Sequence, residues 1–215
     1  MKKLFLFLGV TLSALTGVHA QDATKADGDV TLEMTDGTVK RGWSRTDMVN
    51  EVKFFEISAE PKGQRTRYDN DQIKRIVFDD GATFVKRDVH SRTLFNKDKI
   101  DKGRWVRVEY TGNGIALYSA YSEGWEQAGN VRRRVQQRAY FIALGSDDPV
   151  WASTDYLSGG TINKAGSNRA MLKYFFTKVY PQYEDFAKRI DDKEFDTKGS
   201  PIEVVRAWEQ AYGGK

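Results

Sequence analysis

Short stretches that alternate apolar and polar residues, separated by turns containing glycine, dominate the first two thirds of this 215-residue chain. From Val30 to Met34 every second residue is apolar, and the pair Asp36-Gly37 follows. Alternation with a period of two predicts a strand with one buried face, and Asp-Gly is typical of tight hairpins. The same phrase returns at 73–85 around Asp80-Gly81. With further strands predicted at 52–57 and 64–68, residues 28–88 fit a small β-barrel of SH3-like size.

The first hairpin also predicts a register. If Asp36-Gly37 is a two-residue loop, Glu33 pairs with Lys40 as a favourable cross-strand charge pair. Arg41 is then the one charged residue on the apolar face, and its side chain has to reach past the edge. The apolar residues expected on that face are Val30, Leu32, Met34, Val39 and Trp43.

A second β-meander is predicted over residues 100–212, after a charged connector at 86–102 that contains His90. Apolar and polar residues alternate on both sides of a turn at 111–114, which indicates a hairpin. Its apolar residues are expected to share one face: Val106, Val108, Tyr110, Ile115, Leu117 and Tyr121. The next strand, at 135–144, ends in the apolar run 140–144, which predicts burial on both sides.

The period changes to a helical one from Ser167 onwards, where Ser167 is predicted to cap the first helix. A second amphipathic series follows Pro181, and Ser200-Pro201-Ile202-Glu203 has the pattern of a capping box with proline at the first helical position. The inward stripe expected for the last helix is Ile202, Val205, Trp208 and Tyr212. The predicted fold class is α+β and mainly antiparallel β, with an N-terminal SH3-like small barrel, a second β-meander and a C-terminal helical segment.

Residues 1–20 predict a secretory signal peptide. Lys2 and Lys3 precede an apolar run that is shorter than the roughly 20 residues needed to span a bilayer, and Val18 and Ala20 supply small residues before a cleavage site. Cleavage would leave 195 residues beginning at Gln21. We therefore expect a periplasmic or secreted protein with no transmembrane segment after cleavage.

The charge balance argues against nucleic acid as a partner. The leader contains two lysines and no acidic residue, so the remaining chain has 32 Lys and Arg against 30 Asp and Glu. A dedicated nucleic-acid binder needs a much stronger basic footprint.

Cysteine and histidine limit the chemistry. The chain has no Cys, and His90 is the only His that remains after the leader is removed. A zinc site is not expected from one His and no Cys, and no nucleophile elbow accompanies His90. The segment 69–71 begins like a calcium loop but lacks the Gly and Glu that complete one, so it predicts a turn. We expect no catalytic residue, no metal site and no cofactor.

Aromatic and basic side chains are the candidates for ligand binding. The aromatic candidates could line a sugar- or peptide-binding surface, although Trp105 could instead pack on the helices. The arginine candidates could bind phosphate, lipopolysaccharide or another anion, although runs of charge are commonly solvated strand ends. The candidates are Trp105, Tyr118, Trp125, Arg132, Arg133 and Arg134.

Short phrases spread over most of the chain after the leader are similar to those of one group of proteins. The phrases are Leu32 with Asp36-Gly37 and Gly42, Ile73-Lys74 with Ile76, Gly114 with Leu117-Tyr118, Tyr140-Phe141, and Phe175-Phe176 with Pro181 before the last helix. On these phrases the chain resembles uncharacterised exported β-rich proteins of Bacteroidetes. The resemblance implies export and a β-rich fold but no particular activity. Such relatives often carry Cys in the helical tail, where this chain has none.

Two functional interpretations follow. The first is a non-enzymatic module of the cell envelope that binds an envelope glycan, lipopolysaccharide or another envelope protein. The alternative is a carboxylate-dependent hydrolase acting on polysaccharide or cell wall. That alternative requires two carboxylates facing each other about 5–9.5 Å apart in a cleft.

Overall fold

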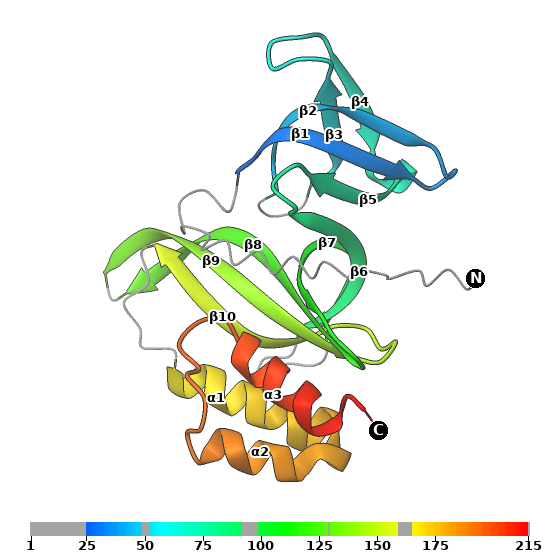
Figure 1. Cartoon of the computed structure of the whole chain (residues 1–215). Coiled ribbons are helices and arrows are strands. Elements are labelled where there is room, and N and C mark those ends of the chain that lie inside the picture. The colour runs from blue at the N-terminus through cyan, green and yellow to red at the C-terminus, as the bar shows by residue number, and fades with distance from the viewer. Residues whose placement is uncertain (1–24, 49–51, 92–98, 129, 159–164, 215) are drawn as a thin grey trace, which may run out of the picture.

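The computed structural model describes residues 25–48, 52–91, 99–128, 130–158 and 165–214, so the leader expected at 1–20 lies outside it. In this part of the chain ten strands form one mixed sheet, with helices following it (Figure 1), which confirms the α+β class. The order across the sheet is β10-β9-β8-β7-β6-β5-β1-β2-β3-β4. The strands are β1 (Lys25–Met34), β2 (Val39–Asp47), β3 (Phe54–Ser58), β4 (Arg65–Asp69), β5 (Ile73–Phe78), β6 (Thr83–Ser91), β7 (Lys99–Thr111), β8 (Ile115–Ala128), β9 (Val131–Leu144) and β10 (Val150–Ser158).

Strands β1–β5 curl around a core of their own. A one-turn 3₁₀ helix at Asn70–Gln72 joins β4 to β5, which confirms the turn predicted there. The similarity of this unit to an SH3 barrel stays a prediction, as do the domain boundaries at 28–88 and 100–212. The buried residues include Val30, Leu32, Met34, Phe55, Ile57, Ile73, Ile76, Phe78, Phe84 and Trp105.

The register predicted for the first hairpin is wrong by one residue. Glu33 lies opposite Val39 instead of Lys40, and it forms an ion pair with Arg75 of β5 at 3.2 Å. A shift by one residue exchanges the two faces of a strand. Val39 and Trp43 therefore turn away from the core, and the Val39 side chain is 52% exposed. Arg41, which was expected on the apolar face, lies on the same outward face as Val39 and Trp43.

The cause of this shift is a three-residue loop. The Met34 N–H donates to the Thr38 carbonyl oxygen at 2.8 Å, and Gly37 has a φ of 85°, which glycine adopts without strain. The second Asp-Gly turn has the equivalent hydrogen bond, from the Phe78 N–H to the Ala82 carbonyl oxygen at 2.9 Å, and Gly81 has a φ of 87°. In both turns the aspartate before the glycine accepts a backbone N–H two residues on. The two turns are thus the same structural device.

Strands β6–β10 close into a second curled unit, which we call the barrel, through a parallel bridge between Val150 of β10 and His90 of β6. The His90 N–H donates to the Pro149 carbonyl oxygen at 2.9 Å beside this bridge. The prediction of a connector at 86–102 is therefore wrong, because β6 and β7 extend through most of this stretch. Residues 92–98 lie outside the described part of the chain. The interior core of this unit is Val89, Val106, Tyr118, Ala120, Phe141 and Ala143.

The shared apolar face predicted for the β7–β8 hairpin is also wrong. The register shifts between Val108 and Tyr110, so Val108 pairs with Tyr118 whereas Tyr110 pairs with Leu117. Such a bulge reverses the alternation along the strand. Val108 thus packs in the barrel interior, and Tyr110 packs on the opposite face under the helices.

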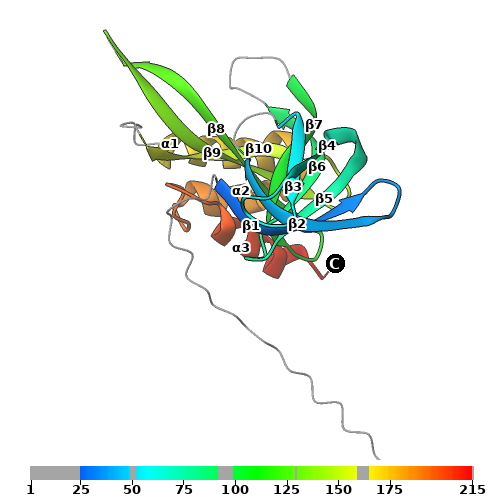
Figure 2. The ribbon, with the colours of Figure 1, turned by 90° about the horizontal axis from the view of Figure 1, so that it is seen from above.

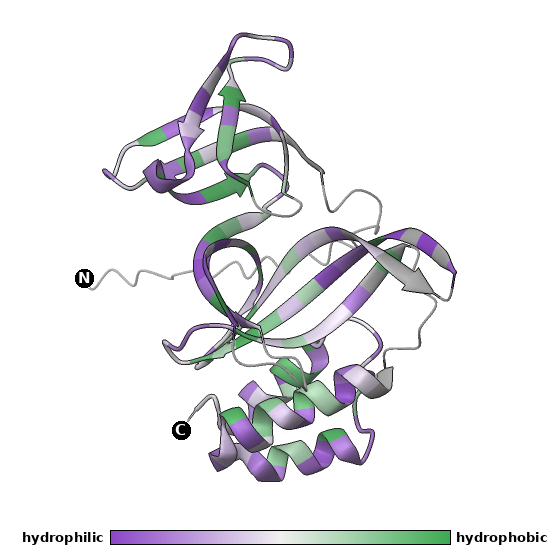
Figure 3. Cartoon of the chain, turned by 180° about the vertical axis from the view of Figure 1, so that it is seen from behind, coloured by the Kyte–Doolittle hydropathy of each residue, from purple (hydrophilic) through white to green (hydrophobic). Residues whose placement is uncertain are grey.

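The helices cover the outer face of β8–β10 (Figure 1), and each carries both apolar and polar residues (Figure 3). They are α1 (Ala165–Tyr174), the π-helical turn η2 (Phe175–Val179), η3 (Pro181–Tyr183), α2 (Glu184–Asp191) and α3 (Ile202–Tyr212). Because one face of β9 lies under the helices and the other lines the barrel, residues 140–144 are buried on both sides, as predicted.

Both predicted helix caps are wrong. Helix α1 begins two residues before Ser167, and α3 begins at Ile202 without a capping hydrogen bond from any side chain. The inward stripe of α3 is confirmed, with Val204 as a further buried residue. Within the described residues, no helix is long and apolar enough to cross a membrane.

Candidate functional site

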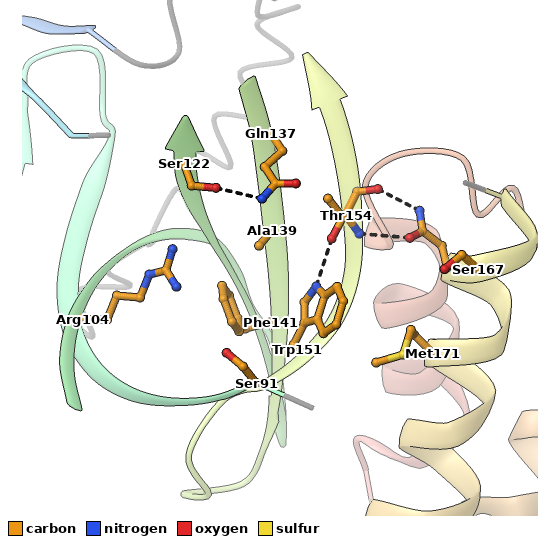
Figure 4. A pocket seen from close by; sticks show the side chains of 11 residues that line it. Ser91, Arg104, Ser122, Gln137, Ala139, Phe141, Trp151, Thr154, Ser167 and Met171 are labelled. Carbon is orange, nitrogen blue, oxygen red and sulfur yellow. Dashed lines mark hydrogen bonds between the residues drawn. The ribbon is translucent and has the colours of Figure 1, made fainter. Parts of the chain in front are cut away.

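A cavity of about 290 Å³ lies between the inner face of the β6–β10 barrel and helix α1 (Figure 4). This volume lies just below the roughly 300–1,000 Å³ typical of small-molecule sites. Every barrel strand contributes to the lining, and α1 closes one side. The lining residues are Ser91, Arg104, Ser122, Gln137, Ala139, Phe141, Trp151, Thr154, Ser167, Asn168 and Met171.

Arg104 supplies the positive charge of the cavity. It lies on β7, opposite α1 across the hollow, with its guanidinium carbon 5.7 Å from the centre of the Phe141 ring. One of its nitrogens contacts Asp101 at 3.4 Å, and Asp101 also contacts Lys99 at 2.8 Å. Burial lowers the pKa of Arg104, whereas Asp101 raises it. Asp101 is therefore shared between two cations, Lys99 and Arg104.

A second arginine faces the same side of the sheet. Arg87 of β6 lies directly opposite Arg104 in the register, and its guanidinium carbon is 5.8 Å from the centre of the Tyr118 ring. Like charges placed directly opposite each other destabilise a sheet. An anion bound near this pair would relieve the repulsion.

Hydroxyl and amide groups surround the cavity. The Gln137 side-chain amide donates to the Ser122 hydroxyl at 3.1 Å. Ser91 and Ser167 also line the cavity, and their hydroxyls have no hydrogen-bond partner among the residues the structure describes. The lining thus offers both donors and acceptors to a polar ligand.

A buried asparagine holds the α1 side of the cavity in place. The Asn168 amide donates to the carbonyls of Thr154 and Thr197, and its oxygen accepts the Thr154 N–H, all at 2.9–3.0 Å. The Trp151 indole N–H donates to the Thr154 hydroxyl at 3.1 Å and to the Ser153 carbonyl at 2.9 Å. Trp151 and α1 are therefore fixed to the same stretch of β10.

The lining favours binding over acid–base chemistry. None of the described residues around this cavity is a carboxylate or a histidine. A guanidinium pairs strongly with carboxylate or phosphate oxygens, and the Phe141 and Trp151 rings offer flat apolar contact area. The arrangement suits a small ligand that combines a negative charge with a polar ring.

The structure places His90 beside acidic residues at a different hollow. His90, Asp147, Asp148 and Tyr180 line a depression of about 280 Å³ near the barrel closure. The His90 ring lies 3.8 Å from Asp148, and the Tyr180 hydroxyl donates to Asp147 at 2.9 Å. Burial and this contact with Asp147 raise the pKa of Tyr180. The two carboxylates are successive residues of one turn, which is not the facing arrangement that the hydrolase alternative requires.

The six candidate residues from the sequence do not form one site. The Trp105 side chain is 8% exposed and packs in the core of β1–β5 rather than on the helices, with its indole N–H donating to Asn70 at 3.2 Å. Tyr118 is buried in the barrel interior. Trp125, Arg132 and Arg134 lie together near the far end of β8 and β9, and the Arg133 side chain lies outside the description.

Arg104 and Trp151 were missed as candidates. Arg104 lies just after the connector predicted at 86–102, in a stretch so rich in Lys and Arg that one more basic residue carried no signal. Trp151 lies on β10, a strand that the sequence reasoning did not predict. No protein-family model, curated protein or solved structure matches the chain. The geometry of the cavity is thus the main guide to function.

Proposed function

We propose that the protein is an exported, non-enzymatic binding module of the cell envelope whose barrel cavity holds an acidic sugar unit. Arg104, a partly buried cation in a cavity with no carboxylate among its described lining residues, is the observation that carries the proposal. The signal peptide predicted at residues 1–20 supports the location, and the resemblance to exported proteins supports it further.

The rest of the lining supports a sugar rather than a simple inorganic anion. Sugar hydroxyls need donors and acceptors, which Ser91, Ser122 and Gln137 provide. The apolar face of a sugar ring needs a flat surface, which Phe141 and Trp151 provide. A carboxylate or phosphate on the same ring would then meet Arg104 as a charge-assisted pair.

Isothermal titration of the mature protein with glucuronate, glucose 6-phosphate and glucose tests the proposal. We expect at least one acidic sugar to bind and glucose to bind more weakly. Arg104→Gln should weaken the acidic sugar about ten- to a hundredfold, since a hydrogen bond to a charged group contributes roughly 1.5–3 kcal/mol. Ala139→Leu should also weaken it by filling the cavity.

Lys102→Gln is the matched control. It removes one positive charge from the same strand, but Lys102 is exposed and does not line the cavity. Its affinity should stay within about twofold of the wild type, because exposed charges are screened by salt. The proposal fails if neither acidic sugar binds, or if Arg104→Gln binds as tightly as Lys102→Gln.

A further inference from the structure

The far halves of β8 and β9 form an arm that projects beyond the rest of the molecule (Figure 2). The two strands stay paired from Ile115 with Leu144 to Ala128 with Val131. The residues of these strands that pack against the helices lie at the other end of the hairpin. They are Ile115, Leu117, Tyr140, Ile142 and Leu144. The arm therefore gains little from the helical core, and Trp125, Arg132 and Arg134 near its end are exposed, whereas Tyr121 is buried.

One face of this arm carries a row of arginines. Arg132, Arg134 and Arg138 occupy alternate positions of β9, so their side chains leave the same face of the strand. With a rise of about 3.4 Å per residue, the first two lie about 7 Å apart and Arg138 lies about 14 Å further along. We call this face, with Trp125 and Tyr121 on the facing strand, the arginine ladder.

Aromatic rings alternate with these arginines. The Arg132 guanidinium carbon is 5.1 Å from the centre of the Trp125 ring, and that of Arg138 is 4.6 Å from the Tyr121 ring. Trp125 is 61% exposed, which is unusual for so large an apolar side chain. Burying the Trp125 ring against a partner would be favourable, and the cation beside it would meet an anion.

The charge on the ladder is only partly balanced. Glu123 accepts hydrogen bonds from Arg134 and from the Gln136 amide. Arg132 has no acidic partner among the residues that the structure describes, and Asp155 lies opposite Arg138 in the register with β10. The exposed end of the ladder therefore keeps a net positive charge where Trp125 is most accessible.

We propose that the arginine ladder binds a linear acidic polysaccharide. Cations in a row along one strand match an extended chain with repeated negative charges, and the exposed indole offers a stacking surface for sugar rings. The ladder lies on the sheet face opposite the barrel cavity, so this inference does not rest on the function proposed above.

Binding of polygalacturonate tests the proposal, with neutral dextran, single-stranded DNA and anionic lipid vesicles as the competing probes. We expect the mature protein to bind polygalacturonate at low salt, to bind dextran much more weakly, and to lose affinity as salt rises. Arg132→Gln with Arg134→Gln should weaken binding about tenfold or more, and Trp125→Ala should weaken it severalfold.

Lys40→Gln with Arg41→Gln is the control of equal charge change. Both residues are exposed on β2, far along the sheet from the arm. This double variant should bind within about twofold of the wild type, and matching melting temperatures would show that the variants fold. The proposal is overturned if polygalacturonate does not bind, if both double variants lose affinity equally, or if DNA or vesicles bind more tightly than the polysaccharide.

Discussion

Replacing Asn168 with alanine should destabilise the protein strongly. Asn168 is 3% exposed and lies on α1. Its side-chain amide forms hydrogen bonds with the N–H and the carbonyl of Thr154 and with the carbonyl of Thr197. Strand β10 pairs with β9 on one side and meets β6 only at Val150 on the other. The Asn168 amide thus takes the place of a neighbouring strand along the open edge of β10.

The magnitude follows from the three lost hydrogen bonds. Each contributes roughly 1 kcal/mol net, and a buried backbone group left without a partner costs as much or more. We therefore expect Asn168→Ala to lower the free energy of unfolding by about 3 kcal/mol, a large part of the roughly 5–15 kcal/mol typical of a folded domain. Asn168→Asp should cost more at neutral pH, because a buried carboxylate would face two carbonyl oxygens.

Urea denaturation followed by tryptophan fluorescence measures this loss. Ser167→Ala is the control, because Ser167 is the preceding residue of the same helix but is exposed. Its effect should stay within about 0.5 kcal/mol. A loss below about 1 kcal/mol for Asn168→Ala, or one equal to that of the control, would refute the role assigned to this amide.

Four further substitutions test other features by thermal or urea unfolding. Tyr121→Phe should keep or raise stability by up to about 1 kcal/mol, because the buried Tyr121 hydroxyl has no hydrogen-bond partner among the described residues. Tyr140→Phe should lower stability by about 1 kcal/mol, because it removes the hydrogen bond that Arg138 donates to the Tyr140 hydroxyl. A larger loss of stability for Tyr121→Phe than for Tyr140→Phe would contradict this reasoning. Hydrogen bonds from Tyr110 and a backbone N–H lower the pKa of Glu209 in the folded protein, so its stabilising effect is present above the unfolded pKa and is lost as pH falls through the folded one. Glu209→Gln should accordingly make unfolding less dependent on pH in the acidic range, and an unchanged acid profile would argue against this contact. Gly42→Ala should cost about 1–3 kcal/mol, because its Cβ would lie 2.6 Å from a carbonyl oxygen of β3, and a neutral effect would mean that β2 can move away.

The sequence predicted the elements better than their faces. The helical tail, the last helix and the doubly buried end of β9 were predicted because periodicity and apolar runs report burial directly. The faces of β2 and of the start of β7 were predicted wrongly, because one residue more in a turn or a bulge reverses the alternation. Neither the loop at Gly37 nor the bulge after Val108 changes the local composition, so the sequence carries no clear sign of either.

The candidate site was harder to predict than the fold. Its residues come from six elements, and Arg104 and Trp151 are brought together only by the closure of β10 against β6. That closure depends on one bridge at Val150, which leaves no periodic pattern in the sequence. The arm was easier, since Trp125 and Arg132 lie on neighbouring strands of one hairpin and are close in sequence.

Trp105 links the two halves of the sheet in a way that affects how the chain can be divided. By sequence it belongs to β7 of the barrel, but its indole fills the core of β1–β5 and bonds Asn70 there. A fragment ending before β7 would leave a hole in its own core and expose apolar side chains to water. The two halves should therefore melt as one cooperative unit, and neither could be exchanged for an unrelated module without repairing the other.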